Sequence, residues 1–173
     1  MAATPARDFS AGDGVVLVGT MKGAFVYRRR GSSHRLVSGP HFRGAPVYSL
    51  ACDDRGGKAR LFAGSENPFF GPALHWSDDL GRTWTEPKKP NVRFPANASL
   101  TVKQIWQITP GPADDPGLVY CGVNPASLFR SKDRGKTWSL VRGLHDHPHR
   151  PKWSPLHPYW PEEHSQRRVQ ACR

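Results

Sequence analysis

Two stretches of the sequence decide the fold. They read LHWSDDLGRTW at residues 74–84 and LFRSKDRGKTW at residues 128–138. Both contain the pattern S-x-D-x-G-x-T-W, and the two patterns lie 54 positions apart. Because five identities within eight residues occur twice, the two stretches are copies of one turn. Internal repeats decide a fold before single elements do, so we predict a repeat protein.

The segments before these stretches repeat as well. Residues 61–64 (LFAG) match residues 119–122 (VYCG), and an apolar run precedes each of them, at 47–51 and at 105–108. Each unit therefore reads as strand, turn, strand, loop, strand, Asp-containing turn and strand. Four strands in roughly 40–50 residues are the usual content of one β-propeller blade.

A third, weaker copy precedes the other two. Residues 15–20 match the glycine-containing strand, residues 24–27 match the strand before the turn, and residues 35–37 supply an outer strand. Residues 28–33 (RRRGSS) replace the Asp-containing turn. Helical periodicity is absent throughout the chain.

We therefore predict an all-β fold, a partial β-propeller of about two and a half four-stranded blades. The blades are expected near residues 12–40, 44–88 and 99–144, within a domain that spans 12–144. The high Gly and Pro content, 17 of each, is typical of many short strands joined by turns.

The residues of the repeated turn have a structural explanation. Ser77 and Asp79 are expected to accept hydrogen bonds from backbone N–H groups of the turn. Gly81 is expected to adopt a positive φ, Thr83 to begin the returning strand, and Trp84 to pack its ring over the hairpin. The same roles are expected in the second copy for Ser131, Asp133, Gly135, Thr137 and Trp138. A residue that recurs at one repeat position serves the repeat, so we predict that neither aspartate is catalytic or a metal ligand.

These motifs resemble the Asp boxes, or BNR repeats, of the sialidase-like superfamily. That superfamily includes exo-sialidases, other glycoside hydrolases and non-enzymatic propellers such as sortilin-type receptors and photosystem-assembly factors. The resemblance implies a six- or seven-bladed ring with the Asp boxes on its rim, away from the central site. Neither Phe42-Arg43-Gly44 nor Val92-Arg93-Phe94-Pro95 matches the early Phe-Arg-Ile-Pro element of sialidases. No Tyr–Glu nucleophile pair is assigned, so we carry over no catalytic residue.

A segment rich in His and Pro follows the last repeat. His145, His147 and His149 alternate, which suits either a metal site or a loop, and Pro148 favours the loop. We predict no metal and no cofactor. In the resembling family a His-Pro-x-Arg-x-x-Trp stretch lines the channel, which implies that Arg150 and Trp153 are ligand contacts.

The remainder of the chain shows neither strand alternation nor another Asp box. We therefore expect residues 145–173 to form a loop followed by a tail, with residues after about 154 outside the fold of a truncated or frame-shifted product. A ring that does not close leaves one blade face open. On that face we expect Ile105, Trp106 and Phe129 to be exposed and to drive self-association.

Composition narrows the function classes. The formal net charge of +11 attracts polyanions, but the longest basic run is Arg28-Arg29-Arg30 and no nucleic-acid-binding motif is present. We predict no specific nucleic-acid partner. The three cysteines are widely spaced, and neither a signal peptide nor a long apolar run is visible. We therefore predict a cytoplasmic protein without a membrane partner.

The favoured function is an Asp-box propeller module, non-catalytic in this chain, that binds a protein partner or a glycan through its loops. Two alternatives stay open. One is a truncated exo-sialidase-type glycoside hydrolase, and the other is a basic polyanion-binding protein.

Overall fold

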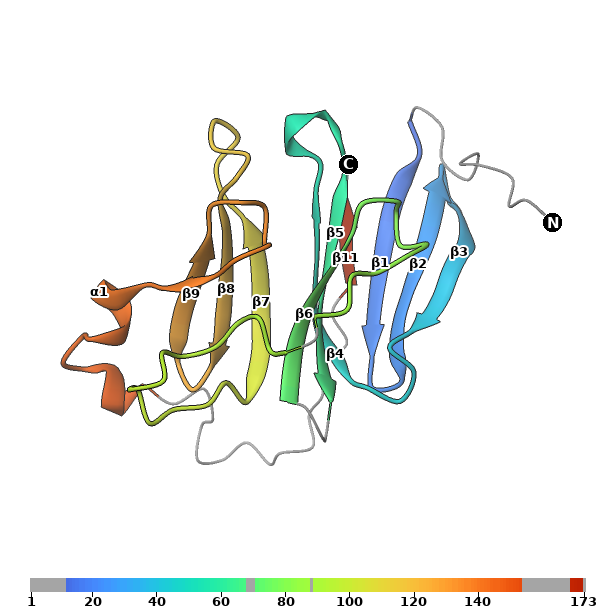
Figure 1. The fold of residues 1–173 in the computed structure, drawn as a ribbon. Helices are drawn as coiled ribbons and strands as arrows, with labels where there is room; N and C mark the ends of the chain where they lie inside the picture. The colour runs from blue at the N-terminus through green and yellow to red at the C-terminus, as the bar shows by residue number, and fades with distance from the viewer. Residues whose placement is uncertain (1–11, 68–70, 88, 154–168, 173) are drawn as a thin grey trace.

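The computed structural model describes residues 12–67, 71–87, 89–153 and 169–172. In this part of the chain three antiparallel sheets stand side by side in chain order (Figure 1). Sheet A has the order β11-β1-β2-β3, sheet B β4-β5-β6, and sheet C β10-β9-β8-β7. The all-β class predicted from the sequence is therefore confirmed.

The strands of sheet A are β1 (Gly14–Thr20), β2 (Gly23–Arg30), β3 (Ser33–His41) and β11 (Val169–Cys172). Those of sheet B are β4 (Val47–Asp53), β5 (Arg60–Asn67) and β6 (Gly71–Ser77). Sheet C contains β7 (Gln104–Pro110), β8 (Val119–Asn124), β9 (Ser127–Ser131) and β10 (Ser139–Leu140). Three one-turn helices complete the elements: η1 (Arg55–Gly57), α1 (Arg142–His145) and η2 (Arg150–Lys152).

The strand register shows that the three sheets repeat one arrangement. Strands β1, β5 and β8 each carry the glycine of the repeat, which pairs with Ala24, Leu74 and Leu128 of the next strand respectively. In β1 and β8, buried and partly exposed residues alternate, as the pleat requires, whereas the first six residues of β5 are all buried. The weak copy detected at residues 15–27 thus has the same strand pairing as the two strong copies.

The core lies between the sheets and forms two clusters. Leu17 and Val26 of sheet A pack against Leu50, Leu61 and Ala63 of sheet B. The second cluster joins sheets B and C through Phe62, Leu74, Ile105, Val119, Cys121 and Phe129. Sheet B is therefore covered on both faces.

The repeat glycine lets neighbouring sheets approach. A Cβ at Gly19 would collide with the backbone carbonyl of Val47, the first residue of β4. At Gly64 it would lie 2.8 Å from Cγ2 of Ile105 in β7. The innermost strand of each following sheet thus packs on the glycine of the preceding one, which explains the repeat of this residue type.

Strand β11 corrects one expectation. Residues after about 154 were expected to lie outside the fold, but Val169–Cys172 pair antiparallel with Val15–Val18 of β1. The pairing satisfies the backbone of an edge strand, which a four-residue segment achieves without a visible pattern of alternation. Residues 154–168 and 173, the rest of the expected tail, lie outside the described residues.

Two other expectations are wrong. Ile105 and Phe129 were expected on an open face, but they are only 2% and 0% exposed, because both point into the cluster between sheets B and C. Trp106, the third residue expected there, is half-buried. Sheet B has three strands in the described residues instead of four. After its Asp box a single backbone bond, from Thr85 N–H to Trp76 O at 2.8 Å, takes the place of a fourth.

Candidate binding edge

The three sheets have two distinct edges. The Asp-box edge carries both S-x-D-x-G-x-T-W turns, the helix η1 and the β7–β8 loop. The connecting-loop edge carries the tight turns β1–β2 and β8–β9 together with the connections between sheets, at residues 42–46, 89–103 and 141–153. The last two of these connections extend well beyond a tight turn and supply most of the exposed side chains at the connecting-loop edge.

The first Asp box is a closed hydrogen-bond network. Ser77 Oγ donates to Asp79 Oδ1 at 2.7 Å and accepts from the Gly81 N–H at 2.8 Å. Asp79 also accepts from the N–H groups of Arg82 and Thr83 and from the Thr83 hydroxyl. Gly81 has a φ of 84°, in the left-handed region that glycine adopts without strain.

The second Asp box repeats this geometry. Ser131 Oγ donates to Asp133 at 2.6 Å and accepts from the Gly135 N–H at 2.7 Å, while the Thr137 hydroxyl donates to Asp133 at 2.6 Å. Gly135 also has a φ of 84°, and Trp138 Nε1 donates to its carbonyl at 3.0 Å. Both oxygens of each carboxylate accept hydrogen bonds from their own turn.

The titration of these aspartates follows from the same contacts. Burial alone would raise the pKa of Asp79, but hydrogen bonds from Thr83, Ser77 and Arg82 outweigh it and hold the pKa below the ordinary value of 3.8. The pKa of Asp133 is lowered in the same way by Ser131 and Thr137 against its own desolvation. Both carboxylates are therefore held in the ionised form by the hydrogen bonds of their own turns.

An arginine network joins sheets B and C at the Asp-box edge. Arg60 donates two hydrogen bonds of 2.7 Å to the carboxylate of Asp78 and a third, also 2.7 Å, to the carbonyl of Arg134. The buried Asp53 receives two hydrogen bonds from the guanidinium of Arg55 and one from its backbone N–H, and the guanidinium reaches on to the carbonyls of Pro112, Asp115 and Leu118. These bonds hold the second Asp box against sheet B.

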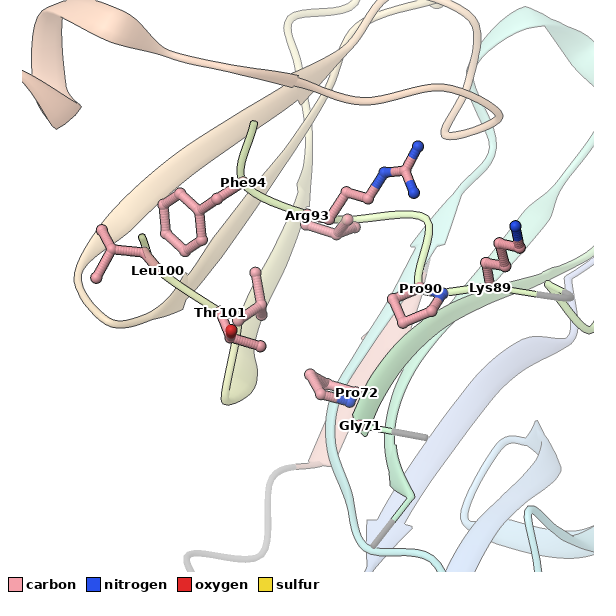
Figure 2. A pocket seen from close by; sticks show the side chains of 10 residues that line it. Gly71, Pro72, Lys89, Pro90, Arg93, Phe94, Leu100 and Thr101 are labelled. Atoms are coloured by element: carbon pink, nitrogen blue, oxygen red, sulfur yellow. The ribbon is translucent and has the colours of Figure 1, made fainter. Parts of the chain in front are cut away.

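The connecting-loop edge contains a hollow. It has a volume of about 350 Å³ and is lined by Gly71, Pro72, Lys89, Pro90, Val92, Arg93, Phe94, Leu100, Thr101 and Val102. Figure 2 shows Lys89 and Pro90 on one side of the hollow and Leu100 and Thr101 on the other. Lys89 and Arg93 are exposed cations, whereas Val92, Phe94 and Val102 form a buried apolar floor. The hollow therefore combines positive charge with an apolar surface.

Arg150 and Trp153, the candidate ligand contacts, lie at the same edge. Arg150 Nε donates to the carbonyl of Ala126, in the β8–β9 turn, at 2.9 Å. Trp153 is 39% exposed and stacks on His147 with ring centroids 5.2 Å apart. The structure connects this segment to the hollow, because Phe94 packs against the ring of His145 at 5.5 Å.

The three alternating histidines do not converge. His145 Nδ1 lies 3.2 Å from Ser127 Oγ, whereas His147 stacks on Trp153 and meets the ring of His149 edge to face. Across the described residues, no group of three or more His, Cys, Asp or Glu side chains is arranged to hold a metal ion.

The structure brings together a tyrosine and a glutamate that the sequence analysis did not pair. Tyr48 is the second residue of β4 and Glu66 the second-to-last residue of β5, next to the pair formed by Val47 and Ser65. Burial first, and then the negative charge of Glu66, raise the pKa of Tyr48, while a hydrogen bond with Gln104 opposes the shift. Burial also raises the pKa of Glu66, and Tyr48 packs against Trp106 at 6.0 Å. The pair depends on the register of β4 and β5, which shifts between Val47 and Ser49, so no sequence signal indicated it.

A second polar pair lies behind the first Asp box. His75 Nε2 lies 2.8 Å from Ser65 Oγ, and His75 Nδ1 lies 3.0 Å from the carbonyl of Thr85. Because a carbonyl only accepts, Nδ1 carries the proton and Nε2 accepts from the Ser65 hydroxyl. Both side chains are buried and His75 packs on Phe42, so the pair joins β5, β6 and the segment after the Asp box.

Comparisons with known proteins identify a similarity among solved structures alone. No protein-family model and no curated protein matches the chain. Among solved structures, the chain is similar to YCF48 bound to D1 peptide, at 16% sequence identity and a TM-score of 0.42. The match covers 80% of this chain and 45% of the YCF48 chain, so this chain spans less than half the length of that protein. No helix in the described part is long and apolar enough to cross a membrane.

Proposed function

We propose that the protein is an Asp-box propeller module of the sialidase-like type that binds a ligand at its connecting-loop edge and catalyses no reaction there. In this proposal the three sheets are consecutive blades, and the two Asp boxes hold the blades together. The ligand is a protein segment or a glycan that presents an acidic group beside an apolar surface.

The hollow beside Arg93 carries this proposal. Its two cations, Lys89 and Arg93, are exposed and suited to a carboxylate, sulfate or phosphate group. Its apolar floor and the exposed Leu100 and Trp153 supply contact area, and exposed aromatic and apolar side chains of this kind commonly anchor a partner. By contrast, the Asp-box carboxylates are occupied by their own turns and offer a ligand nothing.

The binding proposal is tested with arrays of acidic peptides and of sialylated and sulfated glycans, probed with the fluorescently labelled protein. The hit of highest affinity is then titrated against Arg93→Ala, Trp153→Ala and the matched control Lys136→Ala. Lys136 is an exposed cation on the opposite edge, so its loss changes the net charge equally. We expect each of the first two changes to weaken binding about tenfold or more, and the control to have little effect.

Two results would overturn the proposal. If Lys136→Ala weakens binding as much as Arg93→Ala does, and affinity falls steeply with salt, the protein is a general polyanion binder. If a fluorogenic sialoside is hydrolysed and Tyr48→Phe or Glu66→Gln abolishes the activity, the pair beside Gln104 is a hydrolase site.

A further inference from the structure

Sheets A and C each have a face that no other described sheet covers. Sheet B packs on sheet A through Leu61 and Ala63 and on sheet C through Phe62 and Leu74. Alternation along the strands therefore places the remaining residues of sheets A and C on outward faces. Figure 1 shows these two sheets at opposite ends of the row.

The outward face of sheet A, called face A below, is apolar. Val18 of β1 lies opposite Phe25 of β2. Val16 lies opposite Tyr27, which in turn lies opposite Leu36 of β3. Val16 and Val18 lie three residues and one residue before the repeat glycine of sheet A. The same two positions are Leu61 and Ala63 in sheet B, and Val119 and Cys121 in sheet C. In sheets B and C these positions are buried against the preceding sheet. Face A therefore carries apolar residues at the positions that the preceding sheet covers in sheets B and C.

The outward face of sheet C, called face C below, is the other half of the same contact. It contains Tyr120, Gly122, Leu128 and Arg130, at the positions of Phe62, Gly64, Leu74 and Trp76 in sheet B. In sheet B these residues receive the following sheet. A Cβ at Gly122 would find its nearest described neighbour, Gln107 of its own sheet, at 3.8 Å, so no described residue of another sheet packs on this glycine.

We propose that face C of one copy of the chain packs on face A of a second copy, and the reverse, so that two copies close into a ring of six sheets. The contact would continue the A–B and B–C interfaces that the chain already forms twice. A two-fold axis makes both new contacts identical and covers both faces, neither of which another described sheet of the same copy covers. The proposal concerns the sheet faces and does not depend on the ligand suggested above.

Charge gives the pairing a recognisable dependence on salt. Each copy has a formal net charge of +11, so two copies repel each other at low ionic strength. Added salt screens this repulsion without weakening apolar contacts, so association should strengthen as salt rises. Binding of a polyanion shows the opposite dependence.

The proposal is tested by sedimentation velocity over a wide range of protein concentration, at low and at moderate salt. We expect a species of twice the chain mass of 19.3 kDa that grows with concentration and with salt. Gly122→Glu on face C and Val18→Glu on face A should each weaken this association about tenfold or more. Ala113→Glu, which adds the same charge to the exposed β7–β8 loop, is the matched control and should leave association unchanged.

Mixing the two variants separates a head-to-tail contact from a symmetric one. In the mixture, the intact face C of Val18→Glu meets the intact face A of Gly122→Glu, so a mixed dimer with one good contact should form. If two A faces or two C faces met instead, one of the two variants would associate as the unchanged protein does. That result would overturn the proposal.

Folding of the variants is checked by circular dichroism and thermal unfolding. Should Val18→Glu unfold, Leu36→Glu replaces it, because Leu36 is 46% exposed and a charge there stays in contact with water in the single copy. A protein that stays monomeric at every concentration and salt level, or that grows into open-ended polymers, would contradict the closed pair. Association that survives both the face A and the face C variants would contradict it equally.

Discussion

Ile105 of strand β7 packs directly on Gly64 of strand β5, with its Cγ2 only 2.8 Å from where a Cβ of residue 64 would lie. The equivalent glycine of sheet C, Gly122, has no such neighbour among the described residues, and its nearest atom lies at 3.8 Å in the same sheet. The repeat glycine is therefore tightly packed in sheet B, on which sheet C lies, and is not covered by another described sheet in sheet C.

Alanine substitutions at these glycines should therefore have opposite effects. Gly64→Ala forces Ile105 away and should cost about 1–3 kcal/mol of unfolding free energy, as overpacking does. Gly122→Ala should be neutral or stabilise by up to about 0.5–1 kcal/mol, because alanine costs less conformational entropy than glycine within a strand. Urea unfolding of both variants at low protein concentration measures the difference, and equal effects would refute the packing explanation.

The Asp-box aspartates are expected to stabilise the fold without contributing to ligand binding. Asp133→Asn replaces one acceptor oxygen with an amide donor that faces the Thr137 hydroxyl, so it should cost about 1–3 kcal/mol. Asp79→Asn should behave in the same way because Thr83 occupies the equivalent place. Thermal and urea unfolding check the cost, with Lys136→Ala as the neutral control. An unchanged stability, or a ligand affinity lost by a folded variant, would contradict this assignment.

Arg60 is expected to be irreplaceable by lysine. Its guanidinium spans both oxygens of Asp78 and the carbonyl of Arg134, which a single ammonium group does not reproduce. Arg60→Lys should lose about 1–2 kcal/mol, a moderate value because the side chain of Asp78 is 36% exposed. A double-mutant cycle with Asp78→Asn isolates the pair, and a coupling energy near zero would show that Arg60 acts only through its packing.

Stability should fall when the protein is acidified from neutral pH. Burial lowers the pKa of His75 below its ordinary value of 6.5, and hydrogen bonding to Thr85 and the charge of Glu86 do not compensate. The unfolded chain therefore binds a proton below that value more readily than the folded chain does, so protonation favours unfolding. Burial lowers the pKa of His41 too, which adds to the effect.

Urea unfolding between roughly pH 8 and pH 5 measures this dependence. The unfolding free energy should decline as pH drops below about 6.5, and His75→Gln should flatten the decline. A decline of the same size in His75→Gln would assign the effect to other groups. At still lower pH, the stabilisation from Asp79 and Asp133 should be lost as the pH falls through their lowered pKa values.

The sequence by itself determined the repeat and the local chemistry of its turns. In each Asp box the serine, aspartate, glycine and threonine lie within seven residues, and hydrogen bonds among them and the intervening backbone form the turn. Interactions of such short range are encoded locally, so the pattern alone predicted an all-β protein and the strand order within each unit. The match of residues 15–27 to the other units rested on the same local periodicity.

Only the tertiary structure decided which residues meet across the chain. Val169–Cys172 joins β1, about 150 residues earlier, because any unpaired strand edge accepts a backbone partner irrespective of its side chains. Phe129 and Ile105 are buried because sheet B covers the face they share, although their own strands do not show which face is covered. Tyr48 with Glu66, and the hollow between Arg93 and Leu100, likewise depend on strand register and on the path of one long connection. The alternation of apolar side chains shows which residues of a strand share a face. The stacking of successive sheets decides which of those faces another sheet covers.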